Sequence, residues 1–155
     1  MSELELLKEI ENLSKQIKTG ELQCRNLKES DWDTLVSLWK MWPEWEVHPN
    51  KELLPENGTG GFIVEKENTP IIAGFLYTTN SKVGWIEWVV SNADYREDDR
   101  KEAAELLVNG IEHVAKLSGC TIILSVGRNK GLIETHRNLG YTIDKDPSYE
   151  ISKRL

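Results

Sequence analysis

The stretch GWIEWVVSNADYREDDRKEAAELL, residues 84–107, decides how the rest of the chain is interpreted. It begins with Trp, Ile and Val residues typical of a β-strand, passes through a charged segment, and ends with apolar residues at helical spacing. A helix that starts so soon after a strand leaves backbone N–H groups without partners and carries the positive end of the helix dipole. We therefore expect an anion-binding turn, suited to a phosphate, between this strand and this helix.

Two strands are predicted before this stretch, at 61–65 and 71–79, joined by turn-like segments as in an antiparallel meander. The helix that begins near residue 100 carries a wide apolar stripe and should cover one face of the sheet. Residues 121–126 are almost continuously apolar, which predicts a strand buried on both faces. The remaining predicted elements are a helix at 130–138 and two closing strands at 141–143 and 149–152.

The N-terminal part of the chain predicts an additional helix over residues 1–20. Ser2 and Glu5 form a capping-box pattern, and apolar residues follow at helical spacing. Such a helix either packs on its own domain or serves as a dimerisation surface, and both alternatives stay open. A strand at 22–27 and a helix from about 31 to 42 are expected to follow.

Residues 43–61 are rich in Pro, Gly and Asn and predict a long irregular connection with a short helix near 51–54. Connections of this length in small domains are often binding loops. This one begins beside Trp42 and contains Trp45 and Glu46, which either pack in the core or line a binding site.

Composition limits the classes of function. The chain has 155 residues, enough for one domain core, and its net charge of −7 argues against a nucleic-acid or anionic-membrane surface. Cys24 and Cys120 lack metal-site spacing, so we expect reduced thiols in a cytoplasmic protein and no metal. Neither a signal peptide nor a membrane span is indicated.

The element order predicts an α+β domain over residues 21–155, with a central mixed sheet of about six to seven strands flanked by helices. This order, together with several residues, resembles the GNAT superfamily of acyl-CoA-dependent N-acyltransferases. The matching parts are the strand IEWVV at 86–90, Arg96 at the start of the charged loop, Asn129 after a later strand, and the Gly-aromatic pair at 140–141.

The resemblance implies transfer of an acetyl group from acetyl-CoA to a primary amine, carried by a small molecule or by a protein Lys or N-terminus. Glu87 stands where many members carry a general base. His136 stands where the family often has a Tyr that protonates the departing thiolate. The backbone N–H of Val89 or Val90 would bind the thioester oxygen, where two neighbouring strands separate.

The other expected roles also follow from the resemblance. The expected cofactor contacts are Val89, Val90, Tyr95, Arg96, Asp99, Arg100, Lys101 and Asn129. Acidic and aromatic groups favour a cationic acceptor. The expected acceptor contacts are Trp42, Trp45, Glu46 and Trp85.

The charged loop departs from the family pattern, because Asp99 and Lys101 stand where the family usually has glycine or alanine. A carboxylate about 6 Å from a phosphate, at an effective dielectric of about 20, would cost roughly 3 kcal/mol. This departure supports one alternative, a GNAT-fold interaction or regulatory module that has lost CoA binding. A second alternative is altered chemistry such as nucleic-acid modification, against which the acidic charge argues.

Overall fold

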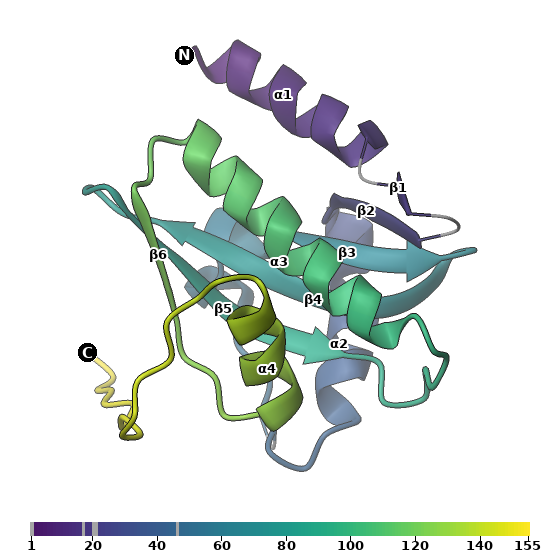
Figure 1. The fold of residues 1–155 in the computed structure, drawn as a ribbon, viewed down its shortest axis with the longest axis vertical. Helices are drawn as coiled ribbons and strands as arrows, with labels where there is room; N and C mark the ends of the chain where they lie inside the picture. The colour runs from purple at the N-terminus through teal and green to yellow at the C-terminus, as the bar shows by residue number, and fades with distance from the viewer. Residues whose placement is uncertain (1, 17, 20–21, 46) are drawn as a thin grey trace.

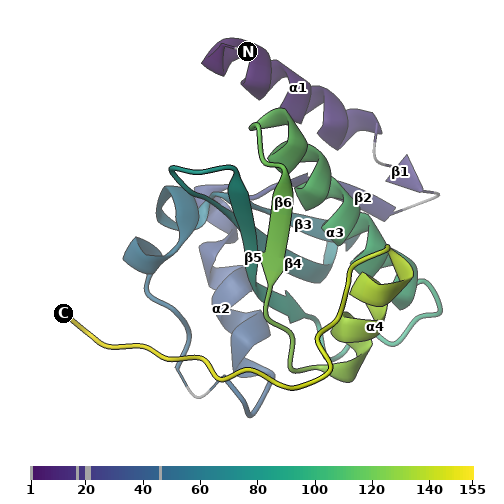
Figure 2. The ribbon, with the colours of Figure 1, turned by 60° about the vertical axis from the view of Figure 1, so that its left-hand side comes forward.

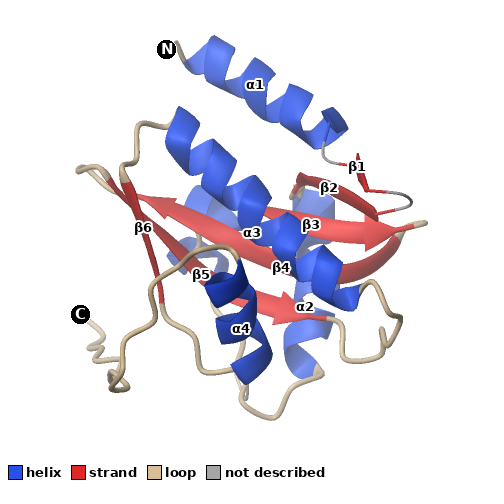
Figure 3. Ribbon diagram, in the orientation of Figure 1, coloured by secondary structure: helices blue, strands red, loops and turns tan. Residues whose placement is uncertain are grey.

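The computed structural model describes residues 2–16, 18–19, 22–45 and 47–155 (Figure 1). Its helices and strands confirm the predicted α+β class, with a mixed sheet flanked by helices (Figure 3). In chain order, the elements are α1 (Glu3–Gln16), β1 (Lys18–Thr19), β2 (Leu22–Asn26), the 3₁₀ turn η1 (Glu29–Asp31), α2 (Trp32–Lys40), the 3₁₀ turns η2 (Lys51–Leu53) and η3 (Pro55–Gly58), β3 (Gly61–Lys66), β4 (Thr69–Thr78), β5 (Val83–Ser91), α3 (Arg100–Leu117), β6 (Ile122–Ser125) and α4 (Lys130–Asn138).

The described strands form one sheet in the order β1-β2-β3-β4-β5-β6. β1 to β5 pair with one another in antiparallel fashion. The short turns between β3, β4 and β5 make the predicted meander. β6 runs parallel to β5, because the intervening α3 returns the chain to the end of the sheet at which β5 begins.

Helices cover both faces of this sheet. α3 and α4 lie on one face and α2 lies on the other, while α1 lies beside α3 near β2 (Figures 1 and 2). Two apolar clusters result, one beneath α3 and one beneath α2. The α3 face buries most of the predicted stripe, namely Ala103, Leu107, Val108, Ile111, Val114 and Ala115, and Ala104 of the same stripe is partly buried.

The predicted capping box begins α1. The Ser2 N–H donates to Glu5 Oε2 (2.9 Å), and the Glu5 N–H donates to Ser2 Oγ (3.1 Å). Ile10 packs against the cluster beneath α3, whereas Leu4 and Leu7 are 62% and 56% exposed. The predicted end of this helix at residue 20 lies outside the described residues.

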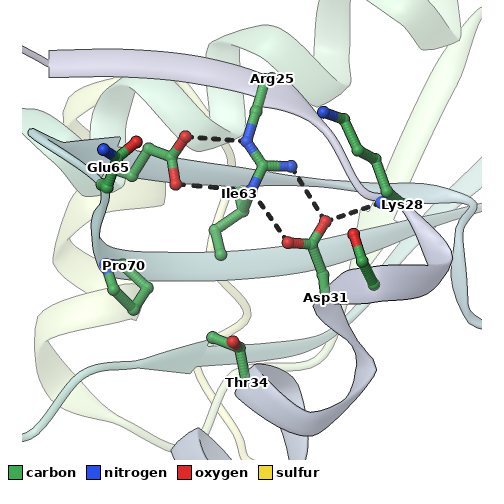
Figure 4. Close-up of a pocket in the computed structure, with 9 residues that line it drawn as sticks. Arg25, Lys28, Asp31, Thr34, Ile63, Glu65 and Pro70 are labelled. Carbon is green, nitrogen blue, oxygen red and sulfur yellow. Dashed lines mark hydrogen bonds and ion pairs between the residues drawn. The ribbon is translucent and has the colours of Figure 1, made fainter.

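An ion-pair cluster joins β2, β3 and the start of α2 (Figure 4). Both terminal nitrogens of Arg25 donate to the Asp31 carboxylate at 2.9 Å, and its Nε donates to Glu65 at 2.8 Å. The remaining guanidinium N–H groups reach Asn26 O and Glu65, so all five donors are used. Arg25 therefore has no donor left for an anion in the hollow beside it. We assign the cluster a structural role.

Two predictions about the C-terminal strands are wrong. Residues 121–126 were expected to be buried on both faces, but β6 is the last strand of the described sheet, with Ile122 52% and Leu124 39% exposed. Residues 141–155 form no strand. Their alternating sequence suits a strand, but this segment meets neither a free strand edge nor an apolar surface to cover. Among the described residues the sheet thus has six strands, one of only two residues.

Candidate active site

A β-bulge in β5 shapes the centre of the site. Phe75 of β4 pairs with Glu87, but Ala73, two residues before Phe75, pairs with Val90, three residues after Glu87. β5 therefore carries one extra residue at this point. Trp88 adopts φ +58°, which is uncommon for a residue other than glycine. Bulges and such backbone conformations are concentrated next to active sites.

The bulge overturns the alternation of side chains that a regular strand would have. Regular alternation along this sequence predicts Trp85, Glu87 and Val89 on one face and Ile86, Trp88 and Val90 on the other. In the structure, Val89 packs with Ile86 in the cluster beneath α3, whereas Trp88 and Val90 pack in the cluster beneath α2. The extra residue reverses the alternation after Trp88. Gly74 makes room for this change, since a Cβ there would lie 3.0 Å from Val89 Cγ2.

β5 and β6 separate beside the bulge, as expected. Their parallel pairing ends at Ile86 and Ser125. Beyond this point a cleft of about 1440 Å³ opens, lined by β5, the segment after β6, and the N-terminal ends of α3 and α4. Ligands of sheet proteins bind preferentially where strands diverge in this way.

Most of the predicted site residues line this one cleft. They are Trp42, Trp45, Glu87, Val89, Val90, Arg96, Arg100, Lys101 and Asn129. Four other predicted residues are described but lie outside its lining, namely Trp85, Tyr95, Asp99 and His136. Glu46 lies outside the described residues.

Glu87 is half-buried in the middle of the cleft. The indole Nε1 of Trp85 donates a hydrogen bond to Glu87 Oε2 at 2.8 Å. Trp85 therefore reaches the cleft through Glu87, whose carboxylate it orients, and the second carboxylate oxygen is left for other partners.

Tryptophan side chains form one wall of the cleft. Trp42 Nε1 donates to the backbone oxygen of Ser91 at 2.8 Å, which fixes the end of α2 against β5. The rings of Trp45 and Trp88 lie 5.3 Å apart. Trp88 Nε1 donates to Tyr77 Oη at 2.7 Å, and burial raises the pKa of Tyr77. The indole N–H groups of Trp42 and Trp88 are held by the sheet, so these two aromatic faces are fixed.

The opposite part of the cleft is basic and contains the N-terminal end of α3. Arg96, Arg100 and Lys101 are exposed and line it. The first N–H groups of α3 and its dipole add further positive potential here. Glu97 and Asp98 also line the cleft and offset part of that potential.

Asp99 does not face this basic region. Its Oδ1 accepts a 2.6 Å hydrogen bond from Tyr95 Oη, and its Oδ2 lies 3.2 Å from Lys66 Nζ. The hydrogen bond from Tyr95, and then the contact with Lys66, lower the pKa of Asp99. Burial and, second, the Asp99 carboxylate raise the pKa of Tyr95 to about 12. The expected repulsion between Asp99 and a phosphate is reduced by this orientation.

A second helix N-terminus, that of α4, opens on the same cleft. Asn129 is its N-cap, and its Oδ1 accepts a hydrogen bond from the Leu132 N–H at 3.1 Å. Residues 130–132 line the cleft beside it. Arg128, which forms a 3.1 Å ion pair with Glu150, adds another positive charge. Two helix N-termini therefore face one space, an arrangement suited to a ligand with several phosphates.

His136 lies on α4, 5% exposed, with its ring edge against Tyr141 at a centroid distance of 4.9 Å. Its Nδ1 contacts the Leu132 carbonyl at 2.8 Å, and since a carbonyl can only accept, Nδ1 carries the proton. Nε2 is buried without a hydrogen-bond partner among the described residues. The structure therefore does not bring His136 together with Glu87 in the cleft.

Several lining residues were not predicted as site residues. They include Arg128, Lys130, Gly131 and Thr135. The helix predicted to start near Lys130 was a usable signal, because its N-terminus follows the predicted contact Asn129.

Other kinds of site find no support in the described part of the chain. It contains no group of three or more His, Cys, Asp or Glu residues placed to hold a metal ion. None of its helices has the length and apolar character needed to cross a membrane. Cys24 and Cys120 are free, and burial raises the pKa of Cys24 to about 12, so this thiol is unreactive.

No protein-family model matches the chain. No curated protein matches it in sequence. Solved structures do match, and 79 chains do so significantly.

Three of these structures illustrate the likeness. N-acetylglutamate synthase from Neisseria gonorrhoeae, complexed with coenzyme A and N-acetyl-glutamate, matches with a TM-score of 0.63 at 18% identity, over 77% of this chain and 28% of that chain. AAC(6')-Iy, in complex with a CoA bisubstrate analogue, matches with a TM-score of 0.61 at 17% identity, over 86% and 99%. An aminoglycoside acetyltransferase from an uncultured soil metagenomic sample, in complex with sisomicin, matches with a TM-score of 0.62 at 11% identity, over 87% and 97%.

These likenesses show that the chain has the fold of the GNAT acetyltransferases, which confirms the fold implied by the sequence. The chain spans about 28% of the synthase, so it corresponds to one part of that protein, whereas it corresponds to nearly the whole of the two aminoglycoside-related structures.

Proposed function

We propose that this protein transfers an acetyl group from acetyl-CoA to a primary amine. One observation carries the proposal: Glu87 lies in a single cleft, at the separation of β5 and β6, between a tryptophan wall and two helix N-termini. A base, an apolar acceptor wall and an anion site are the parts that this reaction needs. The structural neighbours with bound coenzyme A or acceptor analogues support the same assignment.

The donor is proposed to bind along the basic side of the cleft. The N–H groups at the start of α3, with Arg96, Arg100 and Lys101, would hold the pyrophosphate. The start of α4 at Asn129 would contact the same ligand from the other side. The alternative of a module that has lost CoA binding rested on Asp99 and Lys101. Because the Asp99 carboxylate is bound by Tyr95 and Lys66, that alternative has less support.

The acceptor is proposed to bind beside the tryptophan wall. Trp42, Trp45 and Trp88 offer aromatic faces, and Glu44 and Glu87 supply negative charge. This combination favours an ammonium group attached to an apolar or flat body. It is compatible with a small amine and with a lysine side chain.

In the proposed reaction Glu87 takes a proton from the bound ammonium group, directly or through water. The neutral nitrogen attacks the thioester carbonyl carbon, a C–N bond forms, and the C–S bond breaks as the adduct collapses. The second proton of the nitrogen neutralises the departing thiolate, by way of solvent in the open cleft. The products are the amide and free CoA, and Glu87 returns its proton to water.

The developing oxyanion needs a donor near Glu87. From residue 87 onward β5 has no pairing with β6 among the described residues, so that edge of the strand is available to a ligand. A backbone N–H of Val89 or Val90 on that side would bind the thioester oxygen, as the resemblance implies. The bulge at Trp88 changes the direction in which the backbone groups of the following residues point.

The proposal is tested by following thiol release from acetyl-CoA with a panel of amines. The panel includes an aminoglycoside and an amino acid, which correspond to the names of two neighbours, and also a diamine and a lysine peptide. Acceptor-dependent release that is lost in Glu87→Gln, with acetyl-CoA binding retained, supports the proposal. Release that is equal in Glu87→Gln and in the unaltered protein contradicts the role of Glu87.

A further inference from the structure

A chain of two hydrogen bonds runs from the bulge of β5 to the turn η2. The indole Nε1 of Trp88 donates to Tyr77 Oη at 2.7 Å, and Tyr77 Oη donates to the backbone oxygen of Leu53 at 2.7 Å. Chemistry fixes both directions, since an indole N–H can only donate and a carbonyl can only accept. The single hydroxyl proton of Tyr77 is therefore committed to Leu53, and Tyr77 has no proton to donate to a ligand.

The far end of this chain is anchored in the domain. Leu53 ends η2, and the next residue, Leu54, is 4% exposed in the cluster beneath α2. The Leu54 N–H donates to the backbone oxygen of Lys51 at 3.0 Å, and Lys51 Nζ lies 5.1 Å from the ring centroid of Trp32. The carbonyl that accepts the Tyr77 hydroxyl is thus held by residues that pack on the core.

Trp88, at the other end of the chain, has an unfavourable backbone conformation. Its φ of +58° lies in the left-handed region, where a bulky side chain crowds the backbone. Such conformations persist only where surrounding contacts hold them. The side-chain contacts of Trp88 include the hydrogen bond to Tyr77 and the ring of Trp45, at a centroid distance of 5.3 Å. The hydrogen bond is directional, so it fixes the orientation of the indole as well as its position.

We propose that Tyr77 is a positioning residue for acetyl transfer, which holds Trp88 in its left-handed conformation. This inference rests on the proposed function. Because the alternation of β5 reverses at Trp88, this conformation decides where the backbone N–H groups of Val89 and Val90 point. It also fixes one face of the tryptophan wall. Tyr77 does not itself line the cleft, so it acts on the oxyanion and on the acceptor through Trp88.

The protonation state of Tyr77 suits this role. Burial raises the pKa of Tyr77 above its ordinary 10, and the hydrogen bond from Trp88 offsets part of that rise. The hydroxyl therefore keeps its proton at neutral and mildly alkaline pH, and both of its hydrogen bonds persist there. Loss of the hydroxyl should lower the rate by the same factor throughout this range. The loss in Glu87→Gln, by contrast, should shrink as the pH rises.

The first arm of the test compares Tyr77→Phe, which removes the hydroxyl and keeps the ring, with Tyr141→Phe. This matched control removes a tyrosine hydroxyl that donates to Glu112 at 3.1 Å, away from the cleft. We expect kcat to fall about tenfold in Tyr77→Phe and by less than about twofold in the control, with the KM for acetyl-CoA little changed in both. An unchanged kcat in Tyr77→Phe, or an equal loss in the control, overturns the proposal.

The second arm repeats the substitution in Trp88→Gly, because glycine adopts a positive φ without crowding and has no indole. If Tyr77 acts through Trp88, then Tyr77→Phe should change the kcat of this background by less than about twofold. Circular dichroism checks that each protein is folded. A loss that persists at full size in the Trp88→Gly background would show that Tyr77 acts by another route and overturns the proposal.

Nuclear magnetic resonance gives a third readout, which needs no activity. In Tyr77→Phe the indole N–H signal of Trp88 should move and exchange faster with solvent, and the amide signals of Val89 and Val90 should move. In Tyr141→Phe these signals should stay in place. Unmoved signals in Tyr77→Phe overturn the proposal. An unaltered protein that acetylates no amine contradicts the proposed function, and these signals alone then decide whether Tyr77 holds Trp88.

Discussion

The phenol of Tyr95 donates a 2.6 Å hydrogen bond to the Asp99 carboxylate, four residues later and immediately before α3. Lys66, at the end of β3, holds the other carboxylate oxygen at 3.2 Å. Tyr95 is buried beneath α3, so these contacts fasten the charged turn to the sheet. The sequence predicted that Asp99 would crowd the anion site. In the structure Asp99 instead anchors the turn and faces away from that site.

Asp99→Ala should weaken acetyl-CoA binding by about tenfold, because the turn loses both anchors and becomes less ordered before binding. Calorimetric titration measures the change. If Asp99 instead repelled the pyrophosphate, its removal would strengthen binding, so the sign of the effect decides between the two accounts.

The matched control is Asp98→Ala, at the neighbouring residue whose side chain is exposed and lines the cleft. Removing that negative charge should leave binding unchanged or strengthen it a few-fold. Equal weakening by both substitutions would contradict a specific anchoring role for Asp99.

Glu87→Gln should reduce the rate at neutral pH by about a hundredfold or more, because the acceptor amine then lacks a base. The loss should shrink as the pH rises toward the pKa of the amine, where the acceptor deprotonates without help. The measurement is a pH profile of kcat/KM for both proteins. A loss of constant size across the profile would show that Glu87 has another role.

Trp45→Ala should raise KM for the amine by about tenfold, since one aromatic face next to the acceptor is lost. The dissociation constant for acetyl-CoA should not change, because Trp45 lies on the tryptophan wall and not on the basic side. Trp45→Phe keeps an aromatic face and should recover most of the loss. Weakened acetyl-CoA binding in both variants would argue against separate donor and acceptor regions.

Asp31→Asn should lower the free energy of unfolding at pH 7 by about 1–3 kcal/mol, because Arg25 loses one of its two carboxylate partners and keeps only Glu65. The hydrogen bond from Arg25 lowers the pKa of Asp31 below its ordinary 3.8. The stabilisation is therefore fully present above pH 3.8 and is lost as the pH falls through the lower, folded-state value. Denaturant titrations at pH 7 and below pH 3.8 check this, and a difference between the two proteins that does not shrink at the lower pH would contradict it.

The sequence was sufficient for most of the fold because the decisive patterns are local. The α3 stripe, the turns between β3, β4 and β5, and the capping box of α1 each appear in a few consecutive residues. Gly119 and Gly140, at φ +90° and +91°, follow the ends of α3 and α4, where glycine is the residue that a sequence most often shows. Asn129 and the cationic residues of the α3 turn share one cleft with Glu87 because they stand at the N-terminal ends of α4 and α3, while Glu87 lies beside the bulge of β5.

The features that were missed depend on contacts distant in sequence. The positive φ of Trp88 is set by pairing with β4 and by the space above Gly74, neither of which alternation can reveal. The orientation of Asp99 depends on Lys66, thirty-three residues away. The segment 142–155 reads as a strand, but a strand forms only where a free edge is within reach.

The most direct test of the account is calorimetric titration of the unaltered protein with acetyl-CoA, beside Lys101→Glu, which reverses one exposed charge at the start of α3. We predict one site per chain with micromolar affinity, weakened about tenfold or more in the variant. Absence of binding by the unaltered protein, or equal binding by both proteins, would contradict the proposal that this cleft holds the acetyl donor.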